Sequence, residues 1–370
     1  MSQSSIVAIV MPKWGLSMEE GRVNEWLVEE GARIAVGDAL LEVETEKIAG
    51  TVEATDAGLL RRRVAEPGEV YPVKALLGVM AEPEVGDAEI DAFVAAQAAA
   101  LEAAAESEPE PRYHFVEVGG RRLRYADRGE GAPPMVLIHG FGGDLDNWLF
   151  NIDALAAGRR VLALDLPGHG QSSKEVGDGS LATLAATVVG FLDALGVERA
   201  VLVGHSMGAA VAMQVAADAP ERVSGLGLIA AVGLGPEIDA EYIAGFVAAA
   251  SRRELKPWVE RLFADRALVT RQLVEDLLRY KRIDGVAEAL GGLSRALIDA
   301  GQQRIGLVAT ARASRVPVVV IWGSADAIIP AAHAHALGDA ARVVVIDGAG
   351  HMVQMEAASK VNAALLEHLG

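Results

Sequence analysis

The chain of 370 residues carries a formal net charge of −18, and 51% of its residues are hydrophobic. This length allows two or three domains, and the negative charge argues against binding to nucleic acid or to an anionic membrane surface. The absence of cysteine excludes disulfides, a thiolate nucleophile and cysteine-based metal sites. The sequence shows neither a basic leader segment nor an apolar run of membrane-spanning length, so we expect a cytoplasmic protein.

Short apolar runs alternate with glycine-containing turns in residues 1–80, a pattern typical of an all-β domain. A weak internal repeat relates residues 31–43 to residues 68–79 and indicates a small sandwich built from two similar halves. Lys47 stands between two predicted strands among acidic neighbours, so we expect it on an exposed hairpin. An ordinary surface lysine is the alternative. The predicted strands are residues 6–10, 21–28, 39–43, 50–53, 58–64 and 75–80.

This segment resembles the lipoyl domains of 2-oxo acid dehydrogenase complexes, through residues 11–21, 25–31, 37–40 and 44–47. In that family the hairpin lysine carries lipoate in an amide bond, so the resemblance implies that Lys47 is lipoylated. A biotin domain has methionine on both sides of its lysine, whereas this chain has Glu46 and Ile48. Lipoyl domains more often have Asp at the position of Glu46. A dithiolane on a long arm would let a chain without cysteine handle thioesters.

Residues 81–111 contain 11 alanines and nine acidic residues, and they account for half of the net negative charge. We expect a helix from Asp87 to about Glu106 that serves as a semi-rigid linker between two domains. A docking helix for a partner protein is the alternative. The segment is too short and too uniform to form the peripheral-subunit-binding domain that conventional lipoyl acyltransferases have in this region.

Strands and helices alternate from residue 112 to residue 370, which predicts a parallel α/β sheet. A helical insertion is expected over approximately residues 233–313. The predicted strands are residues 115–118, 123–126, 135–138, 161–164, 200–203, 223–229, 316–322 and 341–346, with helices at 181–195 and 353–369.

The stretch Gly204-His205-Ser206-Met207-Gly208 follows a predicted strand and precedes a run of small residues. Its G-x-S-x-G pattern is typical of a nucleophile elbow, in which glycines permit a sharp turn that exposes the serine. A chance match in a glycine-rich chain is the alternative.

Residues 112–370 resemble the α/β-hydrolase fold, whose catalytic residues occur in the order Ser, Asp, His. The resemblance implies that Ser206 is the nucleophile, His351 the general base and then acid, and Asp326 the residue that orients the imidazole. It also implies an oxyanion hole made by the backbone N–H groups of Phe141 and Met207. In this fold the insertion forms a cap over the active site.

Asp165 also follows a strand, but it lies on the wrong side of the elbow for the usual triad, and we do not expect it to be the acid. Three histidines in turn motifs are expected to be structural: His139, His169 and His205. His333 and His335 would face apart on a helix, so no metal site is expected.

Nine basic residues of the insertion are interpreted as a solvated charged face, with contacts to the phosphates of a nucleotide-bearing substrate as the alternative. These residues are Arg252, Arg253, Lys256, Arg261, Arg266, Arg271, Arg279, Lys281 and Arg282.

A lipoyl domain joined to a serine acyl-transfer domain is similar to the dihydrolipoamide acetyltransferase component of bacterial acetoin dehydrogenase complexes. The resemblance implies transfer of acetyl from S-acetyldihydrolipoyl-lysine to coenzyme A. It also implies two partners, the thiamine-diphosphate-dependent acetoin dehydrogenase subunits and dihydrolipoamide dehydrogenase. Conventional lipoyl acyltransferases use the catalytic motif H-x-x-x-D-G. In this chain Asp347-Gly348 is present, but Val343 stands at the position of the histidine. The large cage-like assembly of those enzymes is therefore not assumed, and a homo-oligomer remains possible.

Two other functions remain as alternatives. The same triad could act as a serine hydrolase on an ester, a thioester or a C–C bond. The chain could also be mainly a lipoyl carrier and scaffold, although Ser206, Asp326 and His351 together argue against a vestigial site.

Overall fold

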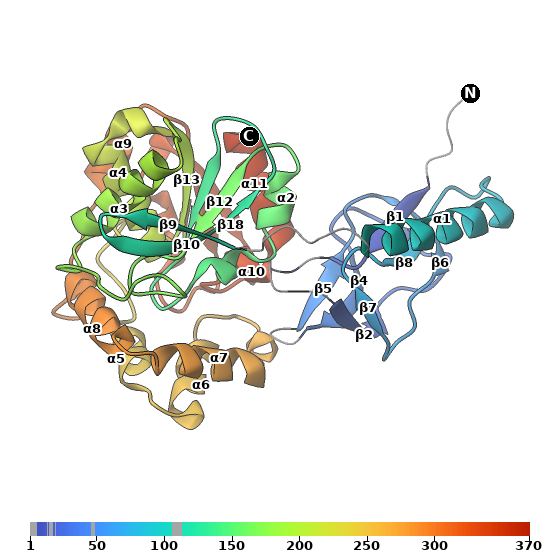
Figure 1. The fold of residues 1–370 in the computed structure, drawn as a ribbon, viewed down its shortest axis with the longest axis horizontal. Coiled ribbons are helices and arrows are strands. Elements are labelled where there is room, and N and C mark those ends of the chain that lie inside the picture. Colours follow the sequence, from blue (N-terminus) through green and yellow to red (C-terminus); the bar gives the residue numbers. More distant parts are fainter. Residues whose placement is uncertain (1–5, 13, 15–17, 19, 46–48, 106–112) are drawn as a thin grey trace. The chain divides into compact units, whose positions relative to one another are not determined.

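The chain divides into two compact units, Met1–Pro111 and Arg112–Gly370, in the computed structural model (Figure 1). The structure describes residues 6–12, 14, 18, 20–45, 49–105 and 113–370. The predicted fold class, an all-β N-terminal part followed by an α/β part, is confirmed. Each unit is described below by itself.

The N-terminal unit is a sandwich of two four-stranded antiparallel sheets, and each sheet takes two strands from each half of the unit. One sheet has the order β1 (Val7–Val10), β8 (Leu76–Met80), β6 (Gly58–Arg63), β3 (Arg33–Ile34). The other has the order β5 (Ala49–Glu53), β4 (Ala39–Glu44), β2 (Glu20–Trp26), β7 (Val70–Pro72). Because apolar side chains alternate with polar ones, residues such as Val23, Val43 and Leu60 are fully buried between the sheets. The expected pseudo-symmetry is therefore present, and the two strands that were not predicted, β3 and β7, are only two and three residues long.

Helix α1 (Asp87–Ala105) follows the sandwich and begins against it rather than free of it. Ile90 is fully buried in a cluster that includes Val79 of β8. Arg61 of β6 donates from Nη1 to the carbonyl oxygens of Glu82 and Val85, at 2.9 and 3.0 Å. The first turns of the expected spacer helix are thus anchored to the preceding sandwich.

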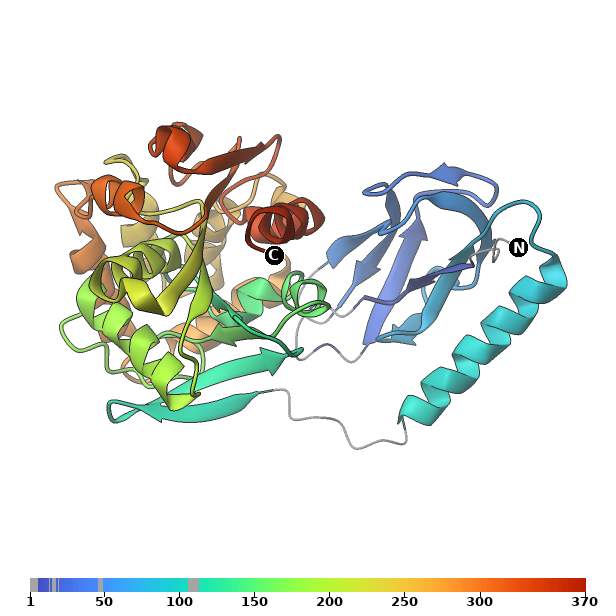
Figure 2. The same cartoon turned by 90° about the horizontal axis from the view of Figure 1, so that it is seen from above.

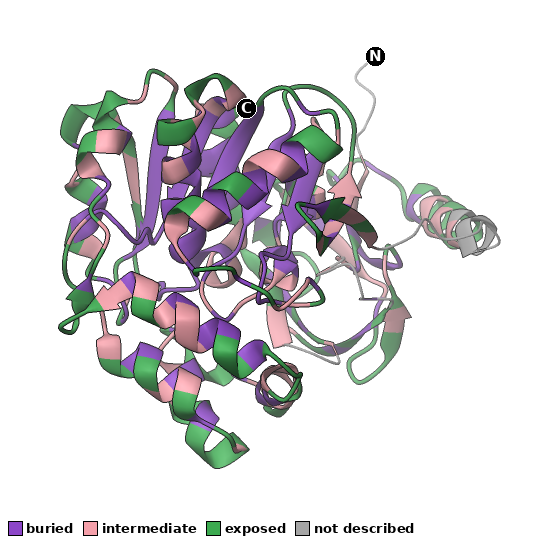
Figure 3. Ribbon diagram, turned by 60° about the vertical axis from the view of Figure 1, so that its left-hand side comes forward, coloured by how far each residue is buried: buried purple, intermediate pink, exposed green. Residues whose placement is uncertain are grey.

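The C-terminal unit is built on an eight-stranded sheet in which six neighbouring strands pair in parallel, and the last two strands at one end of the sheet are joined by antiparallel pairing. Its order is β18 (Arg342–Ile346), β17 (Val318–Gly323), β14 (Val223–Ile229), β13 (Ala200–His205), β11 (Met135–Ile138), β12 (Val161–Leu164), β10 (Arg121–Arg128), β9 (His114–Val118). The strands β11, β12, β13 and β17 are buried along their whole length, which explains their continuous apolar sequences (Figure 3).

Helices cover both faces of this sheet, as Figures 1 and 2 show. On one face lie α3 (Leu181–Ala194), α4 (Met207–Asp218) and α9 (Val308–Ala313); on the other lie α2 (Ile152–Ala156), α10 (Val353–Glu356) and α11 (Ala358–Leu369). The short 3-10 helices are Leu145–Trp148, Pro220–Arg222, Arg266–Leu268, Ala331–His335 and Gly338–Ala340.

The insertion between β14 and β17 forms a helical layer at one edge of the sheet (Figure 1). It contains α5 (Ala240–Ala248), α6 (Arg252–Glu260), α7 (Arg271–Lys281), α8 (Val286–Leu297) and a short hairpin of β15 (Ile298–Asp299) and β16 (Gln302–Gln303). Helix α9 packs beside α4 instead, so the end of the expected range 233–313 belongs with the helices of the sheet. The sequence could not show this return, because both sides of the boundary are helical. No helix in the described part of the chain is long and apolar enough to cross a membrane.

We predict that Ile90→Ala will loosen α1 from the sandwich, because a fully buried isoleucine is replaced by a cavity. The expected loss is about 2–5 kcal/mol for the N-terminal unit, measured by thermal unfolding and limited proteolysis of the full chain. Glu89→Ala, at an exposed neighbour on the same helix, is the control. Equal melting and cleavage of the two variants would show that α1 is not anchored through Ile90.

Candidate active site

Ser206 occupies the sharp turn between β13 and α4, with φ 53° and ψ −114°. This conformation is strained for a residue with a side chain, and it is fixed by a hydrogen bond from the Ser206 N–H to the Ile229 carbonyl at 2.8 Å. A Cβ at Gly204 would collide with the backbone of Gly208. A Cβ at Gly208 would collide with the carbonyl of Ile138 on the neighbouring strand. The two glycines therefore permit the tight turn that places Ser206 on the wall of a pocket.

His351 and Asp326 follow β18 and β17, at the same carboxyl edge of the sheet as Ser206. The imidazole Nδ1 of His351 donates to Asp326 Oδ2 at 2.8 Å. The other carboxylate oxygen of Asp326 accepts from the N–H groups of Ile328 and Ile329, at 2.8 and 3.0 Å. The side chain of Asp326 is fully buried, and these donors compensate for the lost hydration of its carboxylate. The structure thus brings Asp326 onto His351, while His351 and Ser206 line one pocket.

Phe141 and Met207, the two predicted oxyanion donors, line the same pocket as Ser206. Met207 is the first residue of α4, so its N–H belongs to the first turn, where the helix itself offers no acceptor. Phe141 lies in the loop after β11, between Gly140 and Gly142. The oxyanion hole expected from these two N–H groups stays a prediction.

Two buried histidines hold the loop that carries Phe141. His139 donates from Nδ1 to the Gly140 carbonyl at 2.8 Å and accepts at Nε2 from the Leu166 N–H at 3.0 Å. His169 accepts at Nε2 from the Gly142 N–H at 3.1 Å. Accepting at Nε2 requires the neutral ring, and burial lowers the pKa of both histidines. Their place in the structure agrees with the structural role expected from the sequence.

His205 packs against His351, with the ring centroids 4.8 Å apart. Its Nε2 donates to the His351 carbonyl at 3.0 Å, which fixes the backbone that carries the predicted base. Burial, followed by the charge of His351, holds the pKa of His205 well below its ordinary value. His205 therefore stays neutral and supports the site without exchanging protons.

A largely apolar pocket lies above Ser206, with about 770 Å³ of empty space including its open mouth. Beyond His205, Ser206 and His351, its polar side chains in the described part of the chain are Asn147 and Tyr242. Its apolar wall comes mainly from the insertion and the loops beside it: Ile238, Ile243, Phe246, Val259, Leu262, Phe263, Leu273, Leu277, Leu297, Ile328, Met352 and Met355. The insertion therefore acts as the cap that the resemblance implied.

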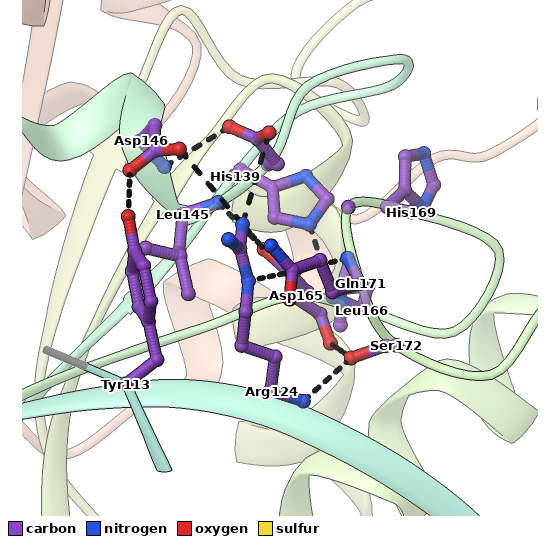
Figure 4. A network of polar contacts seen from close by, with 12 residues as sticks. Tyr113, Arg124, His139, Leu145, Asp146, Asp165, Leu166, His169, Gln171 and Ser172 are labelled. Carbon is purple, nitrogen blue, oxygen red and sulfur yellow. Dashed lines mark hydrogen bonds and ion pairs between the residues drawn. The ribbon is translucent and has the colours of Figure 1, made fainter. Parts of the chain in front are cut away.

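Asp165 forms a buried ion pair with Arg124 instead of contacting His351 (Figure 4). The guanidinium Nε lies 2.6 Å from Asp165 Oδ2, and the side chains are 3% and 0% exposed. The Asp165 carboxylate also accepts from the N–H groups of Leu145 and Gln171, each at 2.8 Å. This network ties the loop after β11 to the loop after β12. Sequence reasoning missed Arg124, because nothing distinguishes it from the other arginines of its strand.

The remaining predicted candidates are separated from this site. His333 Nε2 pairs with Glu237 at 2.7 Å, and His335 is exposed. No cluster of three or more metal-ligating side chains is found among the described residues. Five of the nine named basic residues make ion pairs of the kind expected on a solvated face, such as Arg261 with Asp239 at 2.6 Å and Arg279 with Asp276 at 2.9 Å.

Lys47 lies outside the described residues, in the connection between β4 and β5. These two strands pair antiparallel as far as Glu44, the last residue before the connection, and Ala49, the first residue after it. Its predicted modification stays a prediction.

Comparison with known proteins gives two family matches. Residues 133–358 match the family described as alpha/beta hydrolase fold, and residues 7–79 match the family described as biotin-requiring enzyme. The chain is 55% identical over 366 residues to the dihydrolipoyllysine-residue acetyltransferase component of the acetoin cleaving system of Cupriavidus necator, covering 99% of this chain and 98% of that protein. The chain belongs to this family of acetyltransferase components. The resemblance inferred from the residues is thereby confirmed.

Further relatives agree with this assignment. The component of the same name from Pseudomonas putida is 53% identical and covers 99% of both chains. A meta-cleavage product hydrolase from Pseudomonas fluorescens matches in structure with a TM-score of 0.63 and 26% identity, over 69% of this chain and 96% of that one. The acetyltransferase family therefore shares the α/β sheet of hydrolases and adds the N-terminal sandwich.

We predict that Arg124→Met will destabilise the C-terminal unit by about 3–5 kcal/mol, because Asp165 would be left charged and buried. Denaturant unfolding of the full chain measures this loss. Arg160→Met is the matched control: its pair with Asp127, at 2.7 Å, is partly exposed, so about 1 kcal/mol or less is expected. Similar losses in both variants would contradict the structural importance of the buried pair.

We also predict that stability falls as the pH drops below about 6.5, the ordinary histidine pKa. Below that pH the unfolded chain binds protons that the buried neutral histidines exclude, so folding is penalised until their lowered pKa values are reached. His169→Gln should reduce the slope of the unfolding free energy against pH by up to about 1.4 kcal/mol per pH unit. Urea unfolding between pH 7.5 and 5.5 measures this slope. His335→Gln, at an exposed position, is the control for the substitution itself. An unchanged slope in His169→Gln would contradict the assignment.

Proposed function

We propose that this chain transfers an acetyl group from S-acetyldihydrolipoyl-lysine to coenzyme A during acetoin cleavage, through an acetyl ester on Ser206. The observation that supports this most strongly is the apolar pocket that joins Ser206 to the hydrogen-bonded pair of His351 and Asp326. The same chain carries a lipoyl-type sandwich with Lys47 between two paired strands.

Lipoate would be attached to the Nζ of Lys47. The fit rests on the pairing of β4 with β5, because a connection of only four residues joins two neighbouring antiparallel strands there. When bound, this group supplies a dithiol that carries the acetyl group as a thioester. Its hydrocarbon chain matches the apolar side chains above Ser206, and Asn147 and Tyr242 are the candidates for contacting polar parts of either substrate.

Acyl transfer to the enzyme begins when Ser206 Oγ attacks the thioester carbonyl carbon and gives its proton to His351 Nε2. Asp326 accepts from His351 Nδ1 at 2.8 Å and stabilises the imidazolium that forms. The N–H groups of Phe141 and Met207 would stabilise the oxyanion, and loss of one such donor typically costs about 10²–10³ in rate. His351 would then give this proton to the departing sulfur, so that the acetyl group remains on Ser206 Oγ.

Transfer to the acceptor reverses this sequence with a new thiol. His351 removes the proton from the thiol of coenzyme A, and the sulfur attacks the acetyl carbon of the ester. The bond from acetyl carbon to Ser206 Oγ breaks, and the proton returns from His351 to Oγ. The products are acetyl-coenzyme A and the free serine, so no additional reactant is needed.

The lipoyl arm implies two partners for the proposed reaction. The thiamine-diphosphate-dependent acetoin dehydrogenase subunits would load it, and dihydrolipoamide dehydrogenase would reoxidise it. The lipoyl arm and Ser206 belong to one chain, so the arm has a high effective concentration at the pocket of Ser206. A weak intrinsic affinity of the arm for this pocket is therefore sufficient.

We predict that the full chain, given S-acetyldihydrolipoamide and coenzyme A, forms mainly acetyl-coenzyme A. Ser206→Ala should abolish this by removing the nucleophile, and Lys47→Arg should leave it intact, because the acetyl donor here is free. Chromatographic quantification of acetyl-coenzyme A and acetate measures the outcome. Free acetate formed at the same rate with and without coenzyme A would instead establish a serine hydrolase. Full activity of the whole complex with Ser206→Ala would establish a non-catalytic carrier.

A further inference from the structure

Glu356 lies at the end of α10, five residues after His351, and the mechanism above does not use it. Its carboxylate accepts three backbone hydrogen bonds. Oε2 accepts from the Gly350 N–H at 2.5 Å, and Oε1 accepts from the N–H groups of Ala264 and Asp265 at 2.7 and 3.1 Å. One side chain therefore connects two segments that lie about 90 residues apart in the sequence.

The first segment carries the predicted base. Gly350 immediately precedes His351, and a Cβ at Gly350 would lie 2.6 Å from the Ala264 nitrogen. This close approach shows that the loop of His351 and the turn after α6 pack backbone against backbone. His351 itself is 3% exposed.

The second segment belongs to the cap. Residues 262–265 form the turn after α6, and Leu262 and Phe263 contribute to the wall of the pocket. The Met352 N–H donates to the Leu262 carbonyl at 3.0 Å, beside the three bonds to Glu356. This turn thus covers the His351 side of the pocket, and the Glu356 carboxylate supplies most of the polar bonds that hold it there.

Water is the competing acceptor at this point of the pocket. In hydrolysis, the water oxygen would bond to the acetyl carbon and the bond to Ser206 Oγ would break. His351 would take one water proton and pass it to Oγ, and acetate would leave with release of the second proton. A turn that covers the His351 side of the pocket limits the access of water to His351, the predicted base.

We propose that Glu356 is a positioning residue that seats the cap on the His351 loop and thereby favours thiol over water as the acceptor of the acetyl group. This inference rests on the proposed function. If the two segments met through backbone groups alone, their three N–H donors would need other acceptors. The Glu356 carboxylate accepts from all three at once. Loss of that carboxylate leaves the donors of both segments unpaired and lets the turn lift from the pocket.

The test is the product ratio of Glu356→Gln in the full chain, with S-acetyldihydrolipoamide and coenzyme A as substrates. Glutamine has the same shape, but its amide nitrogen cannot accept a hydrogen bond, so one side of the connection is lost. We expect the acetate fraction to rise severalfold over the wild type, with rates normalised to Ser206 sites titrated by a fluorophosphonate. Glu367→Gln, at an exposed position on α11, is the control and should keep the wild-type ratio.

Glu356→Asp is the second variant and is decisive if Glu356→Gln does not fold. It keeps the charge but is one methylene shorter, so it reaches one segment only, and the acetate fraction should again rise. A lower rate with an unchanged product ratio in the folded variant would overturn the proposal, because it would indicate a purely structural role. A rise of acetate in Glu367→Gln would also overturn it. Wild-type protein that forms no acetyl-coenzyme A would overturn the proposed function instead.

Discussion

The sharp backbone turn at Ser206 is the constraint on which the C-terminal unit depends. Its positive φ is held between a fully buried strand and a buried helix, so the surroundings rather than the residue itself fix this conformation. Gly204 and Gly208 make the required contacts with neighbouring backbone. The parallel sheet places the carboxyl ends of β17 and β18 at the same edge as this turn. The positions of Asp326 and His351 near Ser206 therefore follow from the order of the strands.

The loops around this edge are held by polar groups that are themselves buried. The ion pair of Arg124 and Asp165 joins two loops, and His169 fixes the peptide that follows Phe141. Such groups cost free energy to bury and are tolerated because the Arg124 guanidinium and the His169 ring meet hydrogen-bond partners in defined directions. The result is a rigid frame of polar bonds around a pocket whose own wall is apolar, which suits a reaction that needs fixed donors and little water.

Most of the fold could be predicted from local pattern, because continuous apolar runs mark buried parallel strands and alternating runs mark the sandwich. The arrangement of Ser206, Asp326 and His351 could be anticipated since each follows a strand. Arg124 and Glu356 could not, because a charged residue whose side-chain or backbone partners are distant in the sequence has no local signature. The return of α9 to the sheet was missed for a related reason: helical pattern does not reveal which surface a helix packs against.

The interleaving of strands in the N-terminal sandwich has a topological consequence. The two halves exchange strands so that β4 pairs with β5 in the way that β8 pairs with β1. The pseudo-two-fold therefore relates the connection that contains Lys47 to the gap between the first and last strands, where the chain enters and leaves. If the two ends of the sandwich were joined there, its chain would form a nearly closed ring made of two equivalent halves. The connection between β4 and β5 and the two ends of the sandwich thus occupy corresponding positions of its two halves.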